Sequence, residues 1–582
     1  MTHYSIRSAS DNSWGYNYSM IAWSKQITPT RAALLGLLLV SLIMAWWVGE
    51  QGRPFAHYPP DFDEAVHLLP VVQVANALQQ GDLSGFWQAT SQQDQLAAYP
   101  FIHSWLAAPV WLLRPGLTPQ RWFSLACVVG SILLAFGVSR QLVQRRHWLA
   151  GLVGGGLVLT AFPLWLYGSL AYLEGVGLLL TLLTIYCYLH VIDGSGSRWL
   201  LATSLIAAAV FLTKYNFGLF LIGAIGLNEG VGWLLTRSTR PPWERWLRLA
   251  APAAFILLIW FAAPGRLARF LSFSQAQEGQ LDIWQAAGWF YYPHSFYAHY
   301  LPGPAALLLV GGGLLLALWR WRSGRFRFLL IYLGLSWLLL LLVPQKAPRF
   351  LYTVAPAGLL LAGPFAVWLY EQAAAHSQRW SLPVLLLIGW LLWWGTAVAH
   401  QFSYLQAGLD VAFDSVPATA TGYEWINERT LAQGSTLYIL NEWHLFNRYS
   451  LQWQHLASQG YPPIPMEWSQ VHGGPAPEPT AANLDALLAQ WQTQEIDYLL
   501  SIDGSPAGLY TGWEVVEPLL GLGRLQPVAS SGSLTLRDWD NDYRERVLAA
   551  DFTDPTVWKK EQQTEGGDYE IRLHLYRIIW EN

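Results

Sequence analysis

The chain has 582 residues, of which 53% are hydrophobic and 12% are charged, and its formal net charge is −4. Soluble domains carry about 25% charged residues, so this composition is typical of a membrane protein. The net charge gives no reason to expect a nucleic-acid partner. The two cysteines, Cys127 and Cys187, both lie inside apolar runs, which argues against a disulfide scaffold and against a cysteine metal site.

Apolar runs recur along the chain at the length that crosses about 30 Å of hydrocarbon, roughly 17–25 residues. They predict about eleven spanning helices, over residues 32–48, 120–139, 148–167, 169–191, 199–213, 215–235, 247–264, 302–319, 326–343, 350–370 and 382–400. The fifth and sixth are separated by a tight junction at Lys214, so the count depends on how this junction is interpreted.

Positive residues gather in loops that an eleven-helix arrangement places on one side of the membrane. These residues are Lys25, Arg31, Arg140, Arg145, Arg146, Arg237, Arg240, Arg245, Arg248, Arg320, Arg322, Arg325 and Arg327. The positive-inside rule makes this side cytoplasmic. We therefore predict a multi-pass protein of the plasma or inner membrane, with residues 1–31 as a cytoplasmic N-terminal segment.

The predicted fold class is an α-helical polytopic membrane protein with a C-terminal extracytoplasmic α/β domain. The membrane domain covers residues 32–400 and has two long outer loops, 49–119 and 265–301. Residues 401–582 are richer in polar side chains and contain strand-like runs at 436–440, 498–502 and 533–536, which predicts the α/β domain.

The first outer loop is predicted to be helical. Asp61 and Glu64 form a capping-box pattern, and the apolar residues of 65–78 repeat at helical spacing. Pro70 is expected to kink this helix and Gly81 to end it. A second amphipathic stretch, 102–113, predicts another helix at the membrane surface.

The acidic pair Asp63-Glu64 in this loop is the most informative feature of the chain, because carboxylates are costly near a membrane. Other polar groups are expected near the same outer boundary: Glu174, Lys214, Arg266, Arg269, His294, Lys346 and Arg349. Acids and cations at one depth suit a reaction that activates a hydroxyl and neutralises a leaving phosphate. Glycosyl transfer is one such reaction. On the outer face it would need a sugar donor carried by a membrane lipid, because nucleotide sugars are kept in the cytoplasm.

Short motifs flank these charges, namely Pro60-Asp-Phe-Asp-Glu-Ala65, Gly81-Asp-Leu83, Tyr99-Pro100, Thr213-Lys-Tyr-Asn216 and Lys346-Ala-Pro-Arg-Phe350. In these motifs and in its topology, the chain resembles the GT-C superfamily of integral-membrane glycosyltransferases over roughly residues 32–400. It is most similar to the group, glycosyltransferase family 39, that includes protein O-mannosyltransferases and the aminoarabinose transferase of lipid A.

The resemblance implies a transferase that moves a sugar from a polyprenyl-phosphate-linked donor to a hydroxyl of a lipid, glycan or protein, with inversion in one step. It also implies that Asp63 is the catalytic base, supported by Glu64. Arg349 and Lys346 are then the first candidates to bind the donor phosphate, and Lys214, Arg266, Arg269 and His294 are further candidates. Glu174, His67 and His103 are other candidate site residues.

Each of these groups also has a structural interpretation. Asp63 and Glu64 could charge the first turn of a helix, where the macrodipole favours anions. Lys346 and Arg349 could snorkel at a helix end, and Glu174 could simply pair with Lys214. His67 lies four residues after Asp63 on the same helix face, and His103 lies in the next amphipathic stretch, so these groups could share a divalent metal. A histidine on an amphipathic helix more often packs, however, and no cofactor is required by the sequence.

Two other classes of function remain open from the sequence. A secondary transporter would have paired broken helices and charges at the middle of the bilayer, whereas most charges here lie at helix ends. A noncatalytic membrane scaffold would use its outer α/β domain to bind a partner.

Overall fold

A computed structural model gives the structure of the protein. It describes residues 28–52, 62–91, 99–194, 196–236, 242–275, 286–343, 346–376, 416–440, 448–458, 471–473, 481–503, 513–538 and 567–580. Asp61 of the capping-box pattern and the last predicted span, 382–400, lie outside these ranges.

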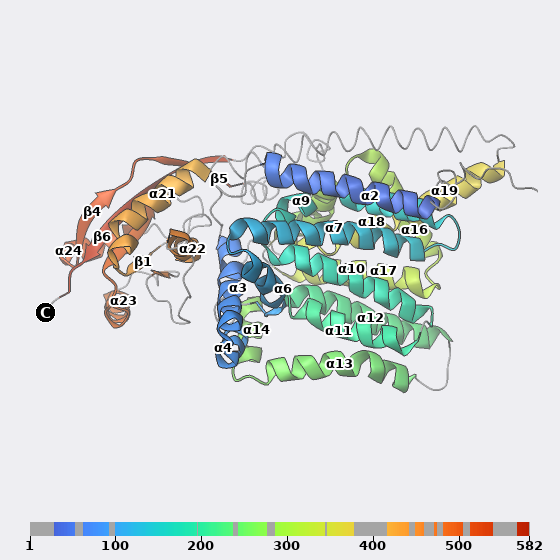
Figure 1. Cartoon of the computed structure of the whole chain (residues 1–582), viewed down its shortest axis with the longest axis horizontal. Coiled ribbons are helices and arrows are strands. Elements are labelled where there is room, and N and C mark those ends of the chain that lie inside the picture. The colour runs from blue at the N-terminus through green and yellow to red at the C-terminus, as the bar shows by residue number, and fades with distance from the viewer. Residues whose placement is uncertain are drawn as a thin grey trace, which may run out of the picture.

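Long helices form one bundle and lie side by side in Figure 1. They are α2 (Pro29–Trp46), α7 (Leu117–Gln141), α8 (His147–Leu159), α10 (Leu173–Ile192), α11 (Ser197–Phe211), α12 (Tyr215–Thr236), α13 (Trp243–Phe261), α16 (Pro304–Trp319) and α17 (Gly324–Leu342). Large apolar side chains such as Leu258 and Leu308 remain exposed on these helices, as expected of surfaces that face lipid.

Further helices complete this part of the chain. They are α3 (Phe62–Gln80), α4 (Leu83–Ser91), α6 (Ile102–Leu113), α9 (Phe162–Gly168), α14 (Arg266–Gln275), α15 (Ala286–Ser295), α18 (Ala355–Leu360), α19 (Ala362–His376), the π-helices η1 (Trp47–Gly52) and η3 (Phe296–Tyr300), and the 3-10 helix η4 (Pro348–Leu351). Figure 1 shows α3 and α4 lying across one end of the bundle, nearly perpendicular to the long helices.

The outer-loop helices agree with the sequence predictions. The stretches 65–78 and 102–113 are helical as α3 and α6. Gly81 follows α3 with a φ of +66°, a conformation that glycine adopts without cost. Pro70 lies inside α3, which continues through it.

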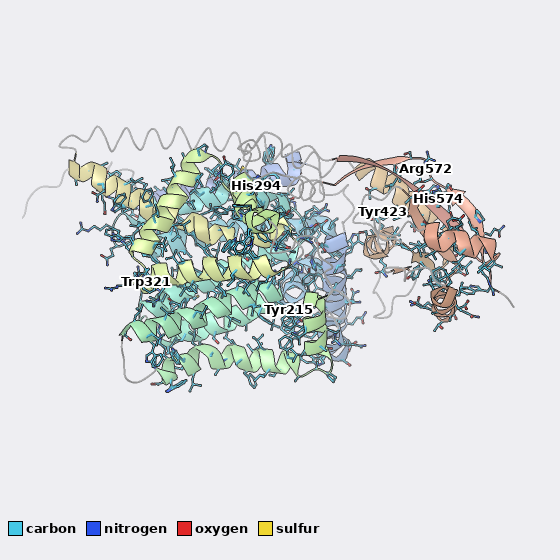
Figure 2. The ribbon with its side chains drawn as sticks, turned by 180° about the vertical axis from the view of Figure 1, so that it is seen from behind. Tyr215, His294, Trp321, Tyr423, Arg572 and His574 are labelled. Carbon is cyan, nitrogen blue, oxygen red and sulfur yellow. The ribbon has the colours of Figure 1, made fainter. Side chains whose placement is uncertain are left out.

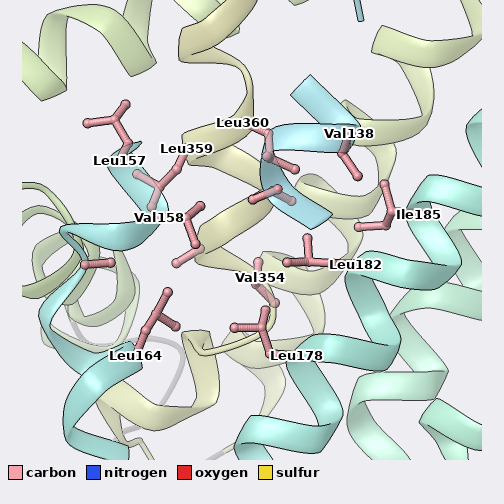
Figure 3. Close-up of a cluster of buried hydrophobic side chains, with 14 of the residues drawn as sticks. Val138, Leu157, Val158, Leu164, Leu178, Leu182, Ile185, Val354, Leu359 and Leu360 are labelled. Atoms are coloured by element: carbon pink, nitrogen blue, oxygen red, sulfur yellow. The ribbon is translucent and has the colours of Figure 1, made fainter. Parts of the chain in front are cut away.

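The bundle core includes branched aliphatic side chains from α7, α8, α10 and α18, among them Val158, Leu178 and Leu359 (Figure 3). Glycines allow close helix contacts there: a Cβ atom on Gly363 of α19 would lie 2.4 Å from the carbonyl oxygen of Ala150 on α8. Small residues at such crossings are the usual means by which membrane helices pack.

Each predicted span up to residue 370 coincides with helical structure, but the count of eleven is not confirmed. By length and composition, five helices of the described chain could cross a membrane, namely the one over Pro29–Glu50 and α7, α10, α12 and α17. A sixth span results if α8 and α9, which meet at a 57° bend, are counted together. The predicted span 350–370 is also broken, into η4, α18 and α19. Helices α11 and α16 are apolar but shorter than about 20 residues.

The C-terminal part contains a six-stranded sheet of β1 (Leu437–Ile439), β2 (Val471–Gly473), β3 (Tyr498–Asp503), β4 (Leu525–Ser530), β5 (Leu534–Asp538) and β6 (Gly567–Ile578). The order is β2-β1-β3-β6-β4, with β5 also paired to β6. Strands β2, β1 and β3 are parallel, and β6 runs antiparallel to β3, β4 and β5. The strand-like runs of the sequence coincide with β1, β3 and β5.

Helices α21 (Val416–Arg429), α22 (Arg448–Ser458), α23 (Ala481–Thr493) and α24 (Trp513–Gly521), with the 3-10 turn η5 (Leu431–Gln433), accompany this sheet. Helix α22 packs on α3, where the buried Trp453 meets Trp111 of α6 with ring centroids 5.6 Å apart. The sheet domain therefore contacts the same end of the bundle that carries Asp63 (Figure 1).

Candidate active site

Asp63 and Glu64 lie in the first turn of α3 and make different contacts. Adjacent helix residues do not share a face. The Asp63 carboxylate pairs with Arg349, whereas the Glu64 carboxylate pairs with Arg121. The two acids of the pair are therefore separate sites.

The pair of Asp63 with Arg349 joins residues 286 positions apart in the sequence. Its side chains keep 15% and 19% of their surface exposed, respectively. The Nε atom of Arg349 is buried and has no hydrogen-bond partner. This pair is thus reachable from solvent and retains a donor for a further acceptor.

The turn that carries Arg349 is fixed by two tyrosines. Arg349 lies in η4, where Tyr300 donates a hydrogen bond to the carbonyl of Pro348 at 3.2 Å. Tyr352, directly after η4, donates to the carbonyl of Leu164 on α9 at 2.9 Å. These contacts hold the guanidinium in place against the start of α3.

A second ion pair lies beside the first. Lys214, at the junction of α11 and α12, donates to Glu174 in the first turn of α10 at 2.7 Å, and both side chains are buried. The pairing of Glu174 with Lys214 that the sequence allowed is therefore observed. The charge of Lys214 acts on Asp63 and that of Glu174 acts on Arg349, so the four groups form one electrostatic cluster.

Aromatic and imidazole rings cover this cluster. The ring of His67 lies 5.0 Å from that of Tyr99 and 6.2 Å from that of His103. Lys214 Nζ lies 5.5 Å from the centre of the Tyr99 ring. The start of α6 is held here because Ile102 N donates to the carbonyl of Leu212 at 3.0 Å.

The protonation states follow from these surroundings. Burial alone would raise the pKa of the Asp63 carboxyl, but the charge and hydrogen bond of Arg349 outweigh it and hold this pKa below its usual range. Burial lowers the pKa of His67 to about 3 and that of His103 to about 3. At neutral pH the site thus combines an ionised carboxylate with neutral imidazoles.

Comparison with known proteins gives the fold of this site. The model of the Alg9-like mannosyltransferase family matches residues 266–452. The structure of ArnT from Cupriavidus metallidurans in the apo state has 16% identity and a TM-score of 0.52, over 86% of this chain and 97% of that chain. The apo oligosaccharyltransferase of Archaeoglobus fulgidus has 9% identity and a TM-score of 0.55, over 94% and 88%.

The chain has the GT-C fold. A structure of ArnT from the same organism bound to undecaprenyl phosphate also matches, with 16% identity and a TM-score of 0.50, over 85% of this chain and 96% of that chain. No curated protein sequence matches the chain. Identities this low show a shared fold, and the predicted GT-C resemblance is confirmed at that level.

Within this GT-C fold, Glu64 does not face the cluster of Asp63. Both side chains of the Glu64–Arg121 pair are fully buried, with contacts of 2.6 and 2.9 Å, and Glu64 also accepts a hydrogen bond from Ala171 N at 2.7 Å. The sequence analysis did not single out Arg121. The available signal was a charge at the start of a predicted span, where charges are costly.

Lys346 is likewise engaged within the GT-C fold. Its ammonium donates to the carbonyls of Leu340, Leu341 and Val343, at 2.8, 3.0 and 2.5 Å. An ammonium has three N–H donors, so this lysine satisfies the C-terminal carbonyls of α17. In this structure the Lys346 ammonium therefore has no free N–H to donate to a donor phosphate.

The remaining basic candidates lie on neighbouring helices. Arg266 begins α14 and donates to the carbonyl of Trp260 at 2.6 Å and to that of Ser91, which ties α14 to α13 and α4. Arg269 follows on α14, and the buried His294 lies in the last turn of α15 (Figure 2). The ion pairs of Asp63 and Glu174 are made with Arg349 and Lys214 instead.

The described ranges contain no group of three or more His, Cys, Asp and Glu side chains that could hold a metal ion. His67 and His103 approach each other near Asp63, but their rings meet edge to face. This packing matches the alternative that the sequence left open for these histidines.

Proposed function

We propose that this protein is a glycosyltransferase that moves a sugar from a polyprenyl-phosphate-linked donor to a hydroxyl acceptor on the outer face of the membrane. The observation that carries the proposal is the partly exposed pair of Asp63 with Arg349 inside a GT-C fold. The ArnT structure bound to undecaprenyl phosphate supports a lipid phosphate as the group that Arg349 binds.

The proposed reaction begins when the donor phosphate binds Arg349. The guanidinium can contact a phosphate with two N–H groups, and its Nε is unpartnered here. Lys214 adds positive charge from the neighbouring pair. Binding of an anion removes much of the field that lowers the pKa of Asp63, and burial then raises this pKa. The donor thereby converts Asp63 from an ion-pair partner into a better base.

Asp63 then accepts the proton of the acceptor hydroxyl while the hydroxyl oxygen attacks the anomeric carbon. The bond between this carbon and the phosphate oxygen breaks, and the polyprenyl phosphate leaves with its new charge next to Arg349. Positive charge that develops on the sugar is stabilised by the nearby carboxylates of Asp63 and Glu174. A single displacement inverts the anomeric configuration.

Other predicted residues receive different roles in this proposal. Glu64 and Lys346 maintain the backbone positions of α3 and α17, because their hydrogen bonds are made within the fold. Arg269 and His294 stay candidates for contacts with the donor. The neutral His67 and His103, with Tyr99, shape the wall against which the sugar would pack.

The proposal also includes the topology. Residues 1–31 are cytoplasmic, the end of the bundle with α3 and α4 faces outward, and residues 401–582 form an extracytoplasmic domain. The contact of α22 with α3 supports this arrangement, because it attaches the sheet domain to the end of the bundle with the acidic pair. The acceptor would reach Asp63 near this contact.

The direct test is an Asp63→Asn variant, compared with Asp82→Asn as a matched control. Asp82 accepts a hydrogen bond from Gly85 N at the start of α4, and asparagine can make the same contact. Mass spectrometry of glycolipids and glycoproteins from cells with each variant would measure the transferred sugar. Loss of the general base is expected to reduce transfer about 100- to 10,000-fold.

The control should transfer sugar like the unmodified protein. A scaffold would be indifferent to Asp63→Asn, and a transporter would give substrate flux in sealed vesicles without a covalent product. Either result would overturn the proposed function.

A further inference from the structure

A second polar cluster lies at the end of the bundle opposite Asp63. Helix α12 begins at Tyr215, beside Lys214, and carries Asn228 and Glu229 near its other end. Glu229 is about 20 Å farther along the helix axis than Tyr215, at a rise of roughly 1.5 Å per residue. Helix α17 contributes Arg327 from its first turn, so this cluster is remote from the transfer site.

The cluster lines a pocket of about 1000 Å³ between the ends of α10, α12, α13 and α17. Arg245, Arg322 and Arg327 line it, together with the single carboxylate of Glu229. Toward the end of α12 the wall is apolar and includes Trp233, Leu234 and Leu235. An excess of guanidinium groups next to an apolar wall indicates an anionic, partly hydrophobic ligand.

The polar side of the pocket is held by a chain of hydrogen bonds. Arg327 Nε donates to Asn228 Oδ1 at 2.8 Å, and Asn228 Nδ2 donates to the Tyr188 hydroxyl at 2.9 Å. Tyr188 donates to Glu229 Oε1 at 2.9 Å, and Arg245 Nη2 donates to the same oxygen at 2.7 Å. Asn228 and Tyr188 thus join the two arginines in one partly buried network.

The arginines of this network keep hydrogen-bonding capacity for a ligand. Arg245 Nε is buried without a hydrogen-bond partner. Arg327 forms no ion pair with a carboxylate in the described part of the chain, and its Nη2 donates a long hydrogen bond of 3.5 Å to Asn228 O. Gly232 leaves the space for this nitrogen, since a Cβ atom there would lie 2.8 Å from it. Arg322 is exposed at the mouth of the pocket.

The first turn of α17 adds to the positive field. Gly324 lines the pocket, and this helix begins without a side-chain cap. Free N–H groups at a helix start favour anions. The arginines and the helix start therefore act on the same space.

We infer that this pocket binds the phosphate headgroup of an anionic membrane lipid, which is a site separate from the proposed transfer site. Leu234 and Leu235 are 65% and 42% exposed, and Trp243 and Leu247 on α13 are exposed as well. Such side chains extend the apolar wall toward the bilayer, where acyl chains would lie. A soluble phosphate would use the arginines but not this wall.

The test is binding of dioleoyl phosphatidylglycerol, compared with dioleoyl phosphatidylcholine, to the full-length protein by native mass spectrometry. The variant is Arg322→Gln, alone and combined with Arg245→Gln. Arg248→Gln is the matched control, because Arg248 lies on α13 but does not line the pocket and pairs with Glu244. Each pocket arginine is expected to contribute about fivefold to the affinity for phosphatidylglycerol, so the double variant should lose about 25-fold.

Glu229→Gln provides the opposite change. An amide can keep the hydrogen bonds to Tyr188 and Arg245 while it removes the negative charge, so affinity for phosphatidylglycerol should rise about fivefold. A role in folding alone would not tighten lipid binding. Equal affinity of the unmodified protein and the double variant would overturn the inference. Displacement of the lipid by millimolar inorganic phosphate would also overturn it, because the ligand would then be a soluble anion.

Discussion

At the scale of single residues, two adjacent carboxylates have environments that assign them different work. Asp63 is partly exposed, pairs with an arginine that has an unused donor, and lies beside a second ion pair. Glu64 is fully buried and saturated by Arg121 and the backbone of Ala171. Proteins give two carboxylates different roles, one reactive and one structural, by placing them in different surroundings.

Glu64→Gln is expected to destabilise the protein by about 3–5 kcal/mol, because it removes the carboxylate charge that pairs with the buried Arg121. The midpoint of thermal unfolding in detergent measures this loss. The double variant Glu64→Leu with Arg121→Met should recover much of it, since both charges are then absent. An unfolding midpoint for Glu64→Gln equal to that of the unmodified protein would refute the structural role.

Arg349→Lys and Arg349→Gln should weaken binding of undecaprenyl phosphate to different degrees. Glutamine removes the charge and is expected to reduce affinity about 10- to 100-fold, on the scale of a hydrogen bond to a charged group. Lysine keeps the charge but not the two-pronged geometry, so its loss should be intermediate. Titration of each variant with the lipid phosphate gives the order, and equal affinities would exclude Arg349 as the phosphate ligand.

At the scale of elements, α3 and α6 bring two histidines into the protein interior. Their pKa values fall to about 3 in the folded state because burial disfavours the charged imidazole. In the unfolded chain the value is about 6.5. Between these limits the unfolded state binds more protons, so stability falls as pH decreases from about 6.5 to about 3.

The midpoint of thermal unfolding should therefore drop between pH 7 and pH 5. Protonation of Asp63 lowers stability further only at more acidic pH, below the ordinary pKa of an aspartate. A variant with His67→Asn and His103→Asn should show a smaller drop over this interval. A pH dependence unchanged by the two substitutions would show that these histidines are not buried in the neutral form.

The sequence predicted elements well where one local signal decides the outcome. Apolar length located the long helices of the bundle up to residue 370, and Gly81 marked the end of α3. The sequence did not predict the helix breaks after Leu159 and at residues 351–361, because uniformly apolar runs contain no period that marks a bend. Pro163 and Pro356, at the starts of α9 and α18, were the available signals.

The site was predictable only in part for a related reason. Asp63 and Arg349 could be placed at one boundary because each adjoins a predicted apolar helix. Their partners depend on side-chain direction within a turn, which separates Asp63 from Glu64 and turns Lys346 back onto α17. The link between Glu64 and Arg121 requires tertiary packing, and no spacing in the sequence encodes it.

At the scale of the whole molecule, the contact between the sheet domain and α3 brings two parts of the chain together at the proposed transfer site. Trp453→Ala should weaken this contact, because Trp453 is 2% exposed and packs on Trp111. A loss of about 3 kcal/mol is expected for a buried tryptophan. Faster cleavage by added protease between the helical part and the sheet domain would report it. Trp580→Ala is the control and should be cleaved at the ordinary rate, because Trp580 follows β6 and packs on a cluster that contains no residue of α3.

The two ends of the bundle divide its charges by function in this account. The end with α3 holds the reacting groups, and the opposite end holds arginines that bind a lipid headgroup. The most direct measurement is an experimental structure of the protein with undecaprenyl phosphate added. The account predicts phosphate density in contact with Arg349 and the Asp63 carboxylate released from it. Phosphate bound only among Arg245, Arg322 and Arg327, with the Asp63–Arg349 pair intact, would contradict the account.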